Sequence, residues 1–272
     1  MIKNIFNYFI LSFKDTFSAT QRQINSNLSF SIKPFIICFT VCLAVLFHNY
    51  YAIHPGFKYL LQTLNSFGLP DFSMRLKDFM YSSSDIRLQF RIYWAIVLFL
   101  LYVVVPVCII RFVFRERLAD YGFKMGSVLK DYKAYLLMLV VMVPLVLYFS
   151  TTKAFLAKYP LYRPAYGHLF PGIFIWEFTY LVQFIGVEFL FRGFMLHGLK
   201  RYFGYYAIFV MMVPYCMVHF QKPMPEAISA IFAGIVLGNF SLKSGSIWLG
   251  VALHFTVALC MDAAALWHHG YF

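Results

Sequence analysis

The chain is poor in charged residues, and acidic ones are the scarcest. Only 12% of its 272 residues are charged, whereas a soluble domain typically carries about twice that fraction. Eleven acidic residues stand against 23 lysines and arginines, which gives a net charge of +12. Hydrophobic residues make up 61% of the chain, and the mean hydropathy is +0.70. A soluble domain is thereby excluded, and an all-α, polytopic membrane bundle is predicted.

Paired cysteine motifs, internal repeats and low-complexity tracts are also missing. The five cysteines all lie in apolar runs and form no C-x-x-C pair: Cys38, Cys42, Cys108, Cys216 and Cys260. They are typical of small core residues rather than of disulfides or zinc ligands. The excess of lysine and arginine lies mainly in the loops, where it orients a membrane protein. We therefore expect no nucleic-acid partner and no disulfide framework.

Long apolar runs predict about seven transmembrane helices in a single domain, residues 34–272. The runs are 34–51, 90–113, 134–150, 170–198, 205–220, 226–242 and 245–266. Most reach the length needed to cross about 30 Å of hydrocarbon. The run 170–198 is longer, so a helix there is tilted, kinked or extends beyond the bilayer.

Residues 1–33 predict an amphipathic helix that lies in the membrane interface. Its apolar residues recur at helical spacing: Ile2, Ile5, Phe6, Phe9, Ile10, Phe13 and Phe17. Basic residues cluster in this segment, in the loop 114–133 and at Lys200 and Arg201. With seven spans these clusters fall on one side, which the positive-inside rule makes cytoplasmic. We therefore expect an integral, multi-pass protein with a cytoplasmic N-terminus.

Four polar residues interrupt the apolar runs: Glu188, Arg192, His219 and His254. Glu188 and Arg192 are four residues apart, so on a helix they share one face. Ionisable groups inside the bilayer are costly and typically mark a functional site or a water-filled cavity. Taken alone, the pair is equally typical of a structural ion pair, and a lone histidine of packing. Tyr215, four residues before His219, is assigned to packing.

Together the four residues could hydrolyse an amide bond in the membrane. A buried carboxylate and a histidine can take a proton from water, and a second histidine can donate to the oxyanion. Zinc at Glu188, His219 and His254 would also serve, but no cofactor or metal is favoured. A third interpretation is a small transporter that uses Glu188 as a proton-coupled site.

The order of these residues resembles the CPBP family of intramembrane proteases, which covers CAAX prenyl endopeptidases, bacteriocin-processing proteins and Abi proteins. Val187-Glu-Phe-Leu-Phe-Arg-Gly193 is similar to its E-E-x-x-x-R-G motif, and Tyr215-Cys-Met-Val-His219 to its aromatic-x-x-x-His motif. Gly245-Ser-Ile-Trp-Leu-Gly-Val-Ala-Leu-His254 looks like its third block. Leu118-Ala-Asp-Tyr-Gly-Phe123 resembles a stretch often found upstream. The CPBP-like core covers about 170–266.

The resemblance implies that Glu188, Arg192, His219 and His254 form the catalytic site. It implies an all-helical bundle in which a glutamate and a histidine activate water, and a membrane-embedded or lipidated peptide substrate. We expect the plasma membrane of a prokaryote. Two positions depart from the pattern: Val187 replaces the first glutamate and Ala258 replaces an asparagine. Glu188, Glu177 or Asp262 could supply the missing carboxylate.

Two functions follow from this resemblance. The first is an intramembrane endopeptidase that cleaves a membrane-associated or lipidated substrate with water activated by Glu and His. The alternative is a catalytically degenerate protein of the same fold that acts as a membrane scaffold, chaperone or immunity factor. Val187 and Ala258 motivate the alternative.

Overall fold

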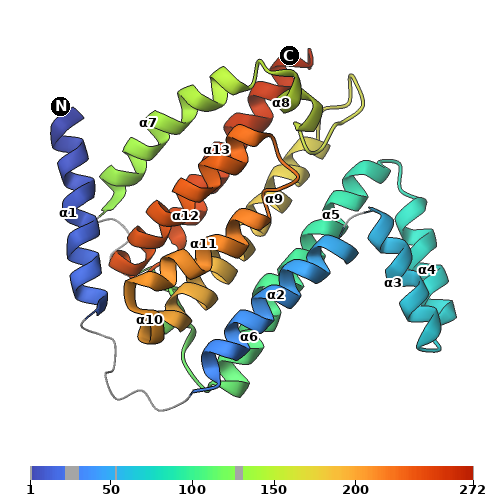
Figure 1. The fold of residues 1–272 in the computed structure, drawn as a ribbon. Coiled ribbons are helices and arrows are strands. Elements are labelled where there is room, and N and C mark those ends of the chain that lie inside the picture. The colour runs from blue at the N-terminus through green and yellow to red at the C-terminus, as the bar shows by residue number, and fades with distance from the viewer. Residues whose placement is uncertain (1, 22–30, 53, 126–130, 272) are drawn as a thin grey trace. The chain divides into compact units, whose positions relative to one another are not determined.

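The computed structural model describes residues 2–21, 31–52, 54–125 and 131–271, without the side chains of residues 2–6, 9 and 54 (Figure 1). In this part of the chain every regular element is a helix and no strand occurs. The predicted all-α fold is therefore confirmed.

The chain divides into two compact units. Unit 1 comprises Met1–Cys42, Pro106–Met138 and Val187–Leu253, and unit 2 comprises Leu43–Val105, Leu139–Gly186 and His254–Phe272. The division falls within three long helices, α2 (Lys33–Tyr51), α7 (Tyr132–Phe149) and α13 (Trp248–His268), and it also cuts two others near one end, after Val105 and after Gly186. The other helices lie wholly or mainly in one unit.

The other helices of unit 1 are α1 (Ile2–Gln21), α6 (Val105–Cys108), η2 (Ile109–Val113), η3 (Leu118–Tyr121), η5 (Phe189–His197), α10 (Gly198–Phe203), η6 (Gly204–Tyr206), α11 (Ala207–Met217) and α12 (Met224–Ser244). Those of unit 2 are α3 (His54–Ser66), α4 (Pro70–Tyr81), α5 (Ile86–Phe99), η1 (Leu100–Val104), α8 (Lys153–Lys158) and α9 (Gly172–Glu188). The elements η1, η2 and η5 are π-helices, whereas η3 and η6 are 3₁₀-helices.

Six helical stretches among the described residues are long and apolar enough to cross a membrane. They are Lys33–Tyr51, Ile86–Val113, Tyr132–Phe149, Gly172–Met217, Met224–Ser244 and Trp248–His268. The predicted count of seven is not confirmed, because the runs 170–198 and 205–220 belong to one helical stretch of 46 residues. The basic residues Lys200 and Arg201 suggested a break there, but α10 and η6 continue the helical turns across it.

Gly204 lets this long stretch fold back on itself within unit 1. The residue has φ 55° and ψ −135° at the end of α10, a conformation that is accessible to glycine but not to residues with a Cβ atom. Beyond the turn, α11 packs against η5, and the rings of Phe191 and Tyr215 lie 5.4 Å apart at 73°. The turn therefore brings residues on either side of Gly204 into contact.

Within unit 1, the N-terminal helix α1 packs against α12 through hydroxyl groups. Ser12, Thr16 and Thr20 recur every four residues and are at most 6% exposed. Asn239 of α12 donates a hydrogen bond to Ser12 Oγ over 3.3 Å. Small polar residues allow such close contact between helices in a membrane. Exposed Leu11, Ile10 and Phe17 suit contact with lipid, and the interfacial position stays a prediction, since Ile2, Ile5, Phe6 and Phe9 lie outside the described side chains.

An ion pair fixes the start of α2 to the loop that follows η2 in unit 1. Lys33 Nζ lies 2.6 Å from Glu116 Oε2, and the hydroxyl of Tyr121 donates to the same carboxylate over 2.5 Å. The ammonium also lies over the ring of Phe114, 4.8 Å from its centroid. Burial alone would raise the pKa of Glu116, but the hydrogen bonds from Lys33 and Tyr121 outweigh it, so this pKa lies below its usual value.

Stacked aromatic rings form the core of unit 2. Trp176, Tyr180 and Phe184 follow one face of α9 at centroid distances of 4.7 and 4.6 Å. Ala258 and Leu266 of α13 belong to the same cluster. The segment 52–89, which lies between the predicted apolar runs 34–51 and 90–113, contains the helices α3 and α4 (Figure 1). Each is short and amphipathic, so a search for long apolar runs passes over it.

The Lys33–Glu116 pair predicts a pH-dependent stability. Because the folded-state pKa of Glu116 is lowered, its contribution is present above the unfolded pKa of about 4.3 and is lost as the pH falls through the folded value. We expect Glu116→Gln to lower the Tm at pH 7, and this difference from the native protein to shrink below about pH 4.3. Thermal unfolding in detergent from pH 7 to pH 3 measures it.

Asp120→Asn is the matched control for this prediction. Asp120 pairs with Arg117 in the same loop, but both side chains are largely exposed, and such pairs contribute little. The control should leave the Tm unchanged at every pH. An equal loss of Tm in both variants would contradict a specific role for the Lys33–Glu116 pair.

Candidate functional site

Glu188 and Arg192 form an ion pair in the interior of unit 1. Arg192 Nη1 lies 3.1 Å from Glu188 Oε1, and the two side chains are 0% and 1% exposed. Glu188 ends α9, and Arg192 lies in the middle of η5. An isolated charge would be expensive at this depth, and each residue neutralises the other. The two residues share a helix face, as their spacing predicts.

The helix that carries Arg192 is a π-helix over nine residues, Phe189–His197, and all nine are buried. We expected an ordinary α-helix here. Most π-helices are single-turn bulges, and they are frequent at functional sites. The apolar spacing of the segment does not distinguish the two forms, because side chains four apart remain on one face in both.

Tyr215 of α11 covers the guanidinium of Arg192. The distance from Arg192 Cζ to the ring centroid is 3.8 Å, and Tyr215 is 1% exposed. A guanidinium over an aromatic face is stabilised by about 2 kcal/mol when water is excluded. The Gly204 turn makes this contact, since it returns α11 to the level of η5.

His219 lies in the turn that follows α11 and is half-buried. Its Nδ1 lies 3.0 Å from the backbone oxygen of Tyr215. A carbonyl oxygen can only accept, so Nδ1 carries the hydrogen and, in the neutral ring, Nε2 carries the lone pair. The rings of His219 and Tyr215 are 5.0 Å apart at 61°. Tyr215 therefore contacts both Arg192 and His219.

Gly250 of α13 lies against the carboxylate of Glu188. A Cβ atom at this position would overlap Glu188 Oε2 and would lie 2.9 Å from Glu188 Cδ. Only glycine allows the backbone of α13 to approach so closely. One oxygen of Glu188 thus contacts the guanidinium, and the other packs against a helix backbone.

The remaining predicted residue, His254, belongs to unit 2. Its ring stacks on that of Phe184 at a centroid distance of 5.6 Å and an angle of 15°. The structure thus brings Glu188, Arg192 and His219 into one unit and describes His254 in the other. The catalytic roles of all four residues stay predictions.

The two alternative carboxylates also lie in unit 2. Asp262 is 1% exposed and accepts a hydrogen bond of 2.8 Å from the indole nitrogen of Trp176. Glu177 is half-buried on α9 beside Trp176. Ala258, where the family pattern has asparagine, is 3% exposed and lies in the aromatic cluster of this unit.

Sequence reasoning missed the roles of Tyr215 and Gly250. Tyr215 was assigned to packing, and Gly250 was only one residue of a longer motif. The four-residue spacing from Tyr215 to His219 indicates a shared helix face, but it cannot reveal that Arg192 lies over the ring of Tyr215. The fit of Gly250 against Glu188 is likewise a contact between distant segments, for which the sequence carries no local signal.

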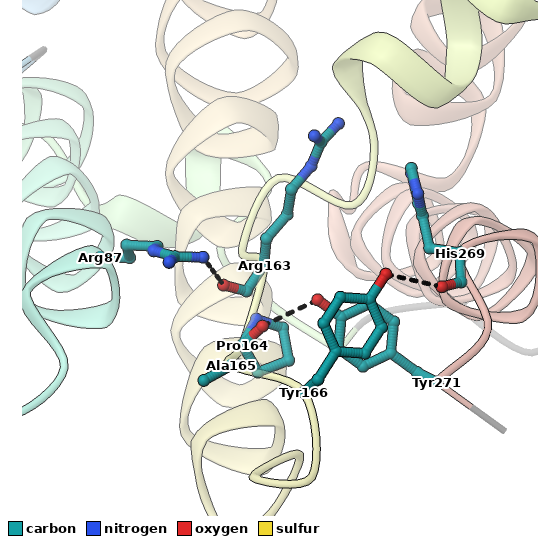
Figure 2. A pocket seen from close by; sticks show the side chains of 7 residues that line it. All are labelled: Arg87, Arg163, Pro164, Ala165, Tyr166, His269 and Tyr271. Carbon is teal, nitrogen blue, oxygen red and sulfur yellow. Dashed lines mark hydrogen bonds between the residues drawn. The ribbon is translucent and has the colours of Figure 1, made fainter.

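A separate cavity of about 400 Å³ lies in unit 2 (Figure 2). It is lined by Arg87, Arg163, Pro164, Ala165, Tyr166, His269 and Tyr271. Arg87 donates to the carbonyl of Arg163 over 3.0 Å, Tyr271 to that of Pro164 over 2.7 Å, and Tyr166 to that of His269 over 3.0 Å. These donors hold the loop 159–171 against the ends of α5 and α13, and no predicted site residue lines the cavity.

A metal site would need a cluster of suitable side chains. Among the described residues, no three His, Cys, Asp or Glu side chains gather closely enough to hold a metal ion. The preference for a reaction without zinc is not tested by this result and stays a prediction.

Comparison with known families supports the resemblance. Residues 169–260 match the model of the Rce1-like family, described as type II CAAX prenyl endopeptidase. The CPBP resemblance is thereby confirmed over this segment, which contains Glu188, Arg192, His219 and His254. None of the curated proteins and none of the solved structures matches the chain. The six long apolar helices indicate an integral, multi-pass membrane protein, and residues 169–260 are similar to CAAX-type membrane proteases.

The contact between Gly250 and Glu188 predicts the effect of one added methyl group. In Gly250→Ala the methyl displaces a carboxylate that is held by Arg192, and overpacking of this kind costs about 1–3 kcal/mol. We expect a clear fall in Tm by thermal unfolding in detergent. Gly238→Ala is the control, because its methyl would meet only side-chain ends, Ile208 Cγ2 and Met211 Cε, at 3.2 Å. Equal Tm values for the two variants would show that Glu188 is not held in place.

Proposed function

We propose that this chain, whose residues 169–260 match the Rce1-like type II CAAX prenyl endopeptidases, is an intramembrane endopeptidase. It hydrolyses a peptide bond of a membrane-associated or lipidated substrate. The observation that carries the proposal is the buried Glu188–Arg192 pair beside Tyr215 and His219, inside the matched segment.

A buried ion pair is a weak way to stabilise a fold, which favours a functional interpretation. The loss of hydration commonly cancels the attraction, and apolar residues of similar volume often serve as well. Here the pair is surrounded by apolar residues that could extend the core. The excess of lysine and arginine over acidic residues also makes a buried glutamate notable, since it is one of only eleven acidic residues.

In the proposed reaction Glu188 and His219 activate a water molecule. The proton leaves water for His219 Nε2, the nitrogen that the Tyr215 carbonyl leaves as acceptor. The hydroxide attacks the carbonyl carbon of the scissile amide. The C–N bond then breaks, and the proton passes from His219 to the leaving amine nitrogen. By the family resemblance, His254 donates a hydrogen bond to the oxyanion.

Arg192 keeps Glu188 ionised and in position during these steps. Its guanidinium is held between the carboxylate and the ring of Tyr215, so the side chain has little freedom to move. Val187 occupies the place of the family's first glutamate. We propose that Glu188 takes over the role of that glutamate in the activation of water. The reaction needs no metal ion in this proposal.

The proposed location and orientation of the protein rest on the family resemblance and on the distribution of basic residues along the chain. The substrate lies in or on the bilayer, which forms the immediate environment of the protein. We propose a cytoplasmic N-terminus, from the basic residues that precede α2 and those in the loop 114–133. A prokaryotic plasma membrane is the proposed location.

The second candidate function is a non-catalytic membrane scaffold, chaperone or immunity factor of the same fold. Two observations favour it: Val187 is apolar and 8% exposed, and Ala258 belongs to an aromatic cluster. The two functions differ in one result. Hydrolysis by the native protein rules out the second, whereas hydrolysis that arises only after Val187→Glu and Ala258→Asn supports it.

The endopeptidase proposal predicts that Glu188→Gln and His219→Ala each reduce peptide hydrolysis by at least about 100-fold, because acid–base catalysis typically contributes that much. The protein is purified in detergent and incubated with a library of membrane-anchored and lipidated peptides, and mass spectrometry identifies the products. His219→Ala leaves the Glu188–Arg192 pair intact, so it separates loss of chemistry from loss of folding.

Glu226→Gln provides the matched control. Glu226 pairs with Lys222 at the same four-residue spacing, over 2.7 Å, but both side chains are partly exposed. The control should cleave at the native rate. Unchanged turnover in both Glu188→Gln and His219→Ala would contradict the proposal.

A further inference from the structure

Most carboxylates of unit 1 already have a cationic partner. Besides the Glu188–Arg192 pair, the ion pairs are Lys33–Glu116, Arg117–Asp120, Lys222–Glu226 and Lys243–Asp131. These contacts occupy nearly all the negative charge of the unit. Its remaining lysines and arginines therefore represent a true excess of positive charge.

Two of these excess cations belong to segments that meet at the C-terminal end of α12, and a third follows the second of them directly in the chain. They are Lys124, which follows η3, and Lys200 and Arg201 of α10. Within the described residues none of the three makes an ion pair. Asp120 is the nearest acidic group in sequence, and it is bound to Arg117 through two hydrogen bonds.

Lys124 is fixed on the turn between α12 and α13. Its backbone oxygen accepts a hydrogen bond of 2.8 Å from Ser246 Oγ. Its side chain passes over Gly245, where a Cβ atom would lie 3.3 Å from Lys124 Cε and 3.4 Å from Nζ. The ammonium group is thus held near the last turn of α12.

Lys200 is tied to the same turn through His197. Its ammonium donates to His197 Nδ1 over 3.0 Å, because a protonated lysine has no lone pair. His197 Nε2 therefore carries the hydrogen in the neutral ring and donates to Ser241 Oγ of α12 over 3.2 Å. His197 is 5% exposed, so it anchors Lys200 and adds no negative charge.

The end of α12 cannot neutralise these cations. A helix C-terminus carries the equivalent of about half a negative charge, against three positive charges here. Lys124 and Arg201 are exposed, and Lys200 is half-buried, so the group remains open to a ligand. A phosphate group, with several acceptor oxygens, is the ligand that lysine and arginine clusters bind best.

The position of the cluster points to phosphate on a lipid rather than in solution. Lys124 lies between the candidate spans Ile86–Val113 and Tyr132–Phe149, and Gly245 lies between Met224–Ser244 and Trp248–His268. Connections of this kind lie at the level of lipid headgroups. Basic residues at this level attract anionic lipids and contribute about a fivefold gain in affinity each.

We propose that Lys124, Lys200 and Arg201 form a binding site for the phosphate group of an anionic phospholipid. The site lies in unit 1 at the end of α12. It is independent of the proposed peptide hydrolysis, since none of its residues belongs to that machinery.

The test titrates the detergent-solubilised full chain with phosphatidylglycerol and counts the bound lipids by native mass spectrometry. Phosphatidylcholine is the control lipid without net charge, and sodium phosphate is the control for binding of a free anion. We expect phosphatidylglycerol to bind in preference to both. The variant Lys124→Gln/Lys200→Gln/Arg201→Gln should lose affinity by about 125-fold, at about fivefold for each cation. Preferential binding of sodium phosphate would overturn the lipid assignment.

Two further variants make the result specific. Lys124→Gln/Arg201→Gln leaves the Lys200–His197 contact intact, and it should still lose affinity by about 25-fold if the triple variant fails to fold. Lys58→Gln/Arg75→Gln/Lys77→Gln removes three exposed cations of α3 and α4 and should bind as the native protein does. Native affinity in the Lys124/Arg201 variant, or an equal loss in the α3–α4 control, would overturn the proposal.

Discussion

The ion pair between Glu188 and Arg192 is the constraint on which the centre of unit 1 depends. Neither charge is stable alone at this depth, and removal of one partner from a buried pair typically costs about 3–5 kcal/mol. Three features accommodate the pair: a π-helix carries Arg192, the ring of Tyr215 covers the guanidinium, and Gly250 makes room for the carboxylate. The turn at Gly204 is required as well, because it returns α11 to the level of η5.

The same contacts connect the ion pair to His219. Tyr215 touches the guanidinium with its ring and accepts the Nδ1 hydrogen of His219 with its carbonyl. One residue thus fixes both the position of Arg192 and the tautomer of the histidine. A shift of Tyr215 would affect both groups at once, which is the behaviour expected of a site held by few, well-determined contacts.

Much of this arrangement could be predicted from the sequence, because it depends on local spacing. The apolar runs gave the helices, and the four-residue interval placed Glu188 and Arg192 on one face. The count of seven spans is not confirmed, since Lys200 and Arg201 resemble a loop although α10 is helical. The search for long apolar runs did not predict the helices α3 and α4, because both are short and amphipathic. The contacts of Tyr215 with Arg192 and of Gly250 with Glu188 could not be predicted, because they join segments that are distant in sequence.

The central claim is that the Glu188–Arg192 pair serves chemistry rather than stability. The most direct measurement is hydrolysis of membrane-anchored peptides by the double variant Glu188→Met/Arg192→Met, together with its Tm. Simultaneous replacement leaves no unpaired charge, and buried pairs exchanged for apolar residues of similar volume often keep their stability. We predict a folded protein, with a Tm close to that of the native chain, that no longer cleaves peptides which the native chain cleaves. Native turnover in this variant would contradict the claim.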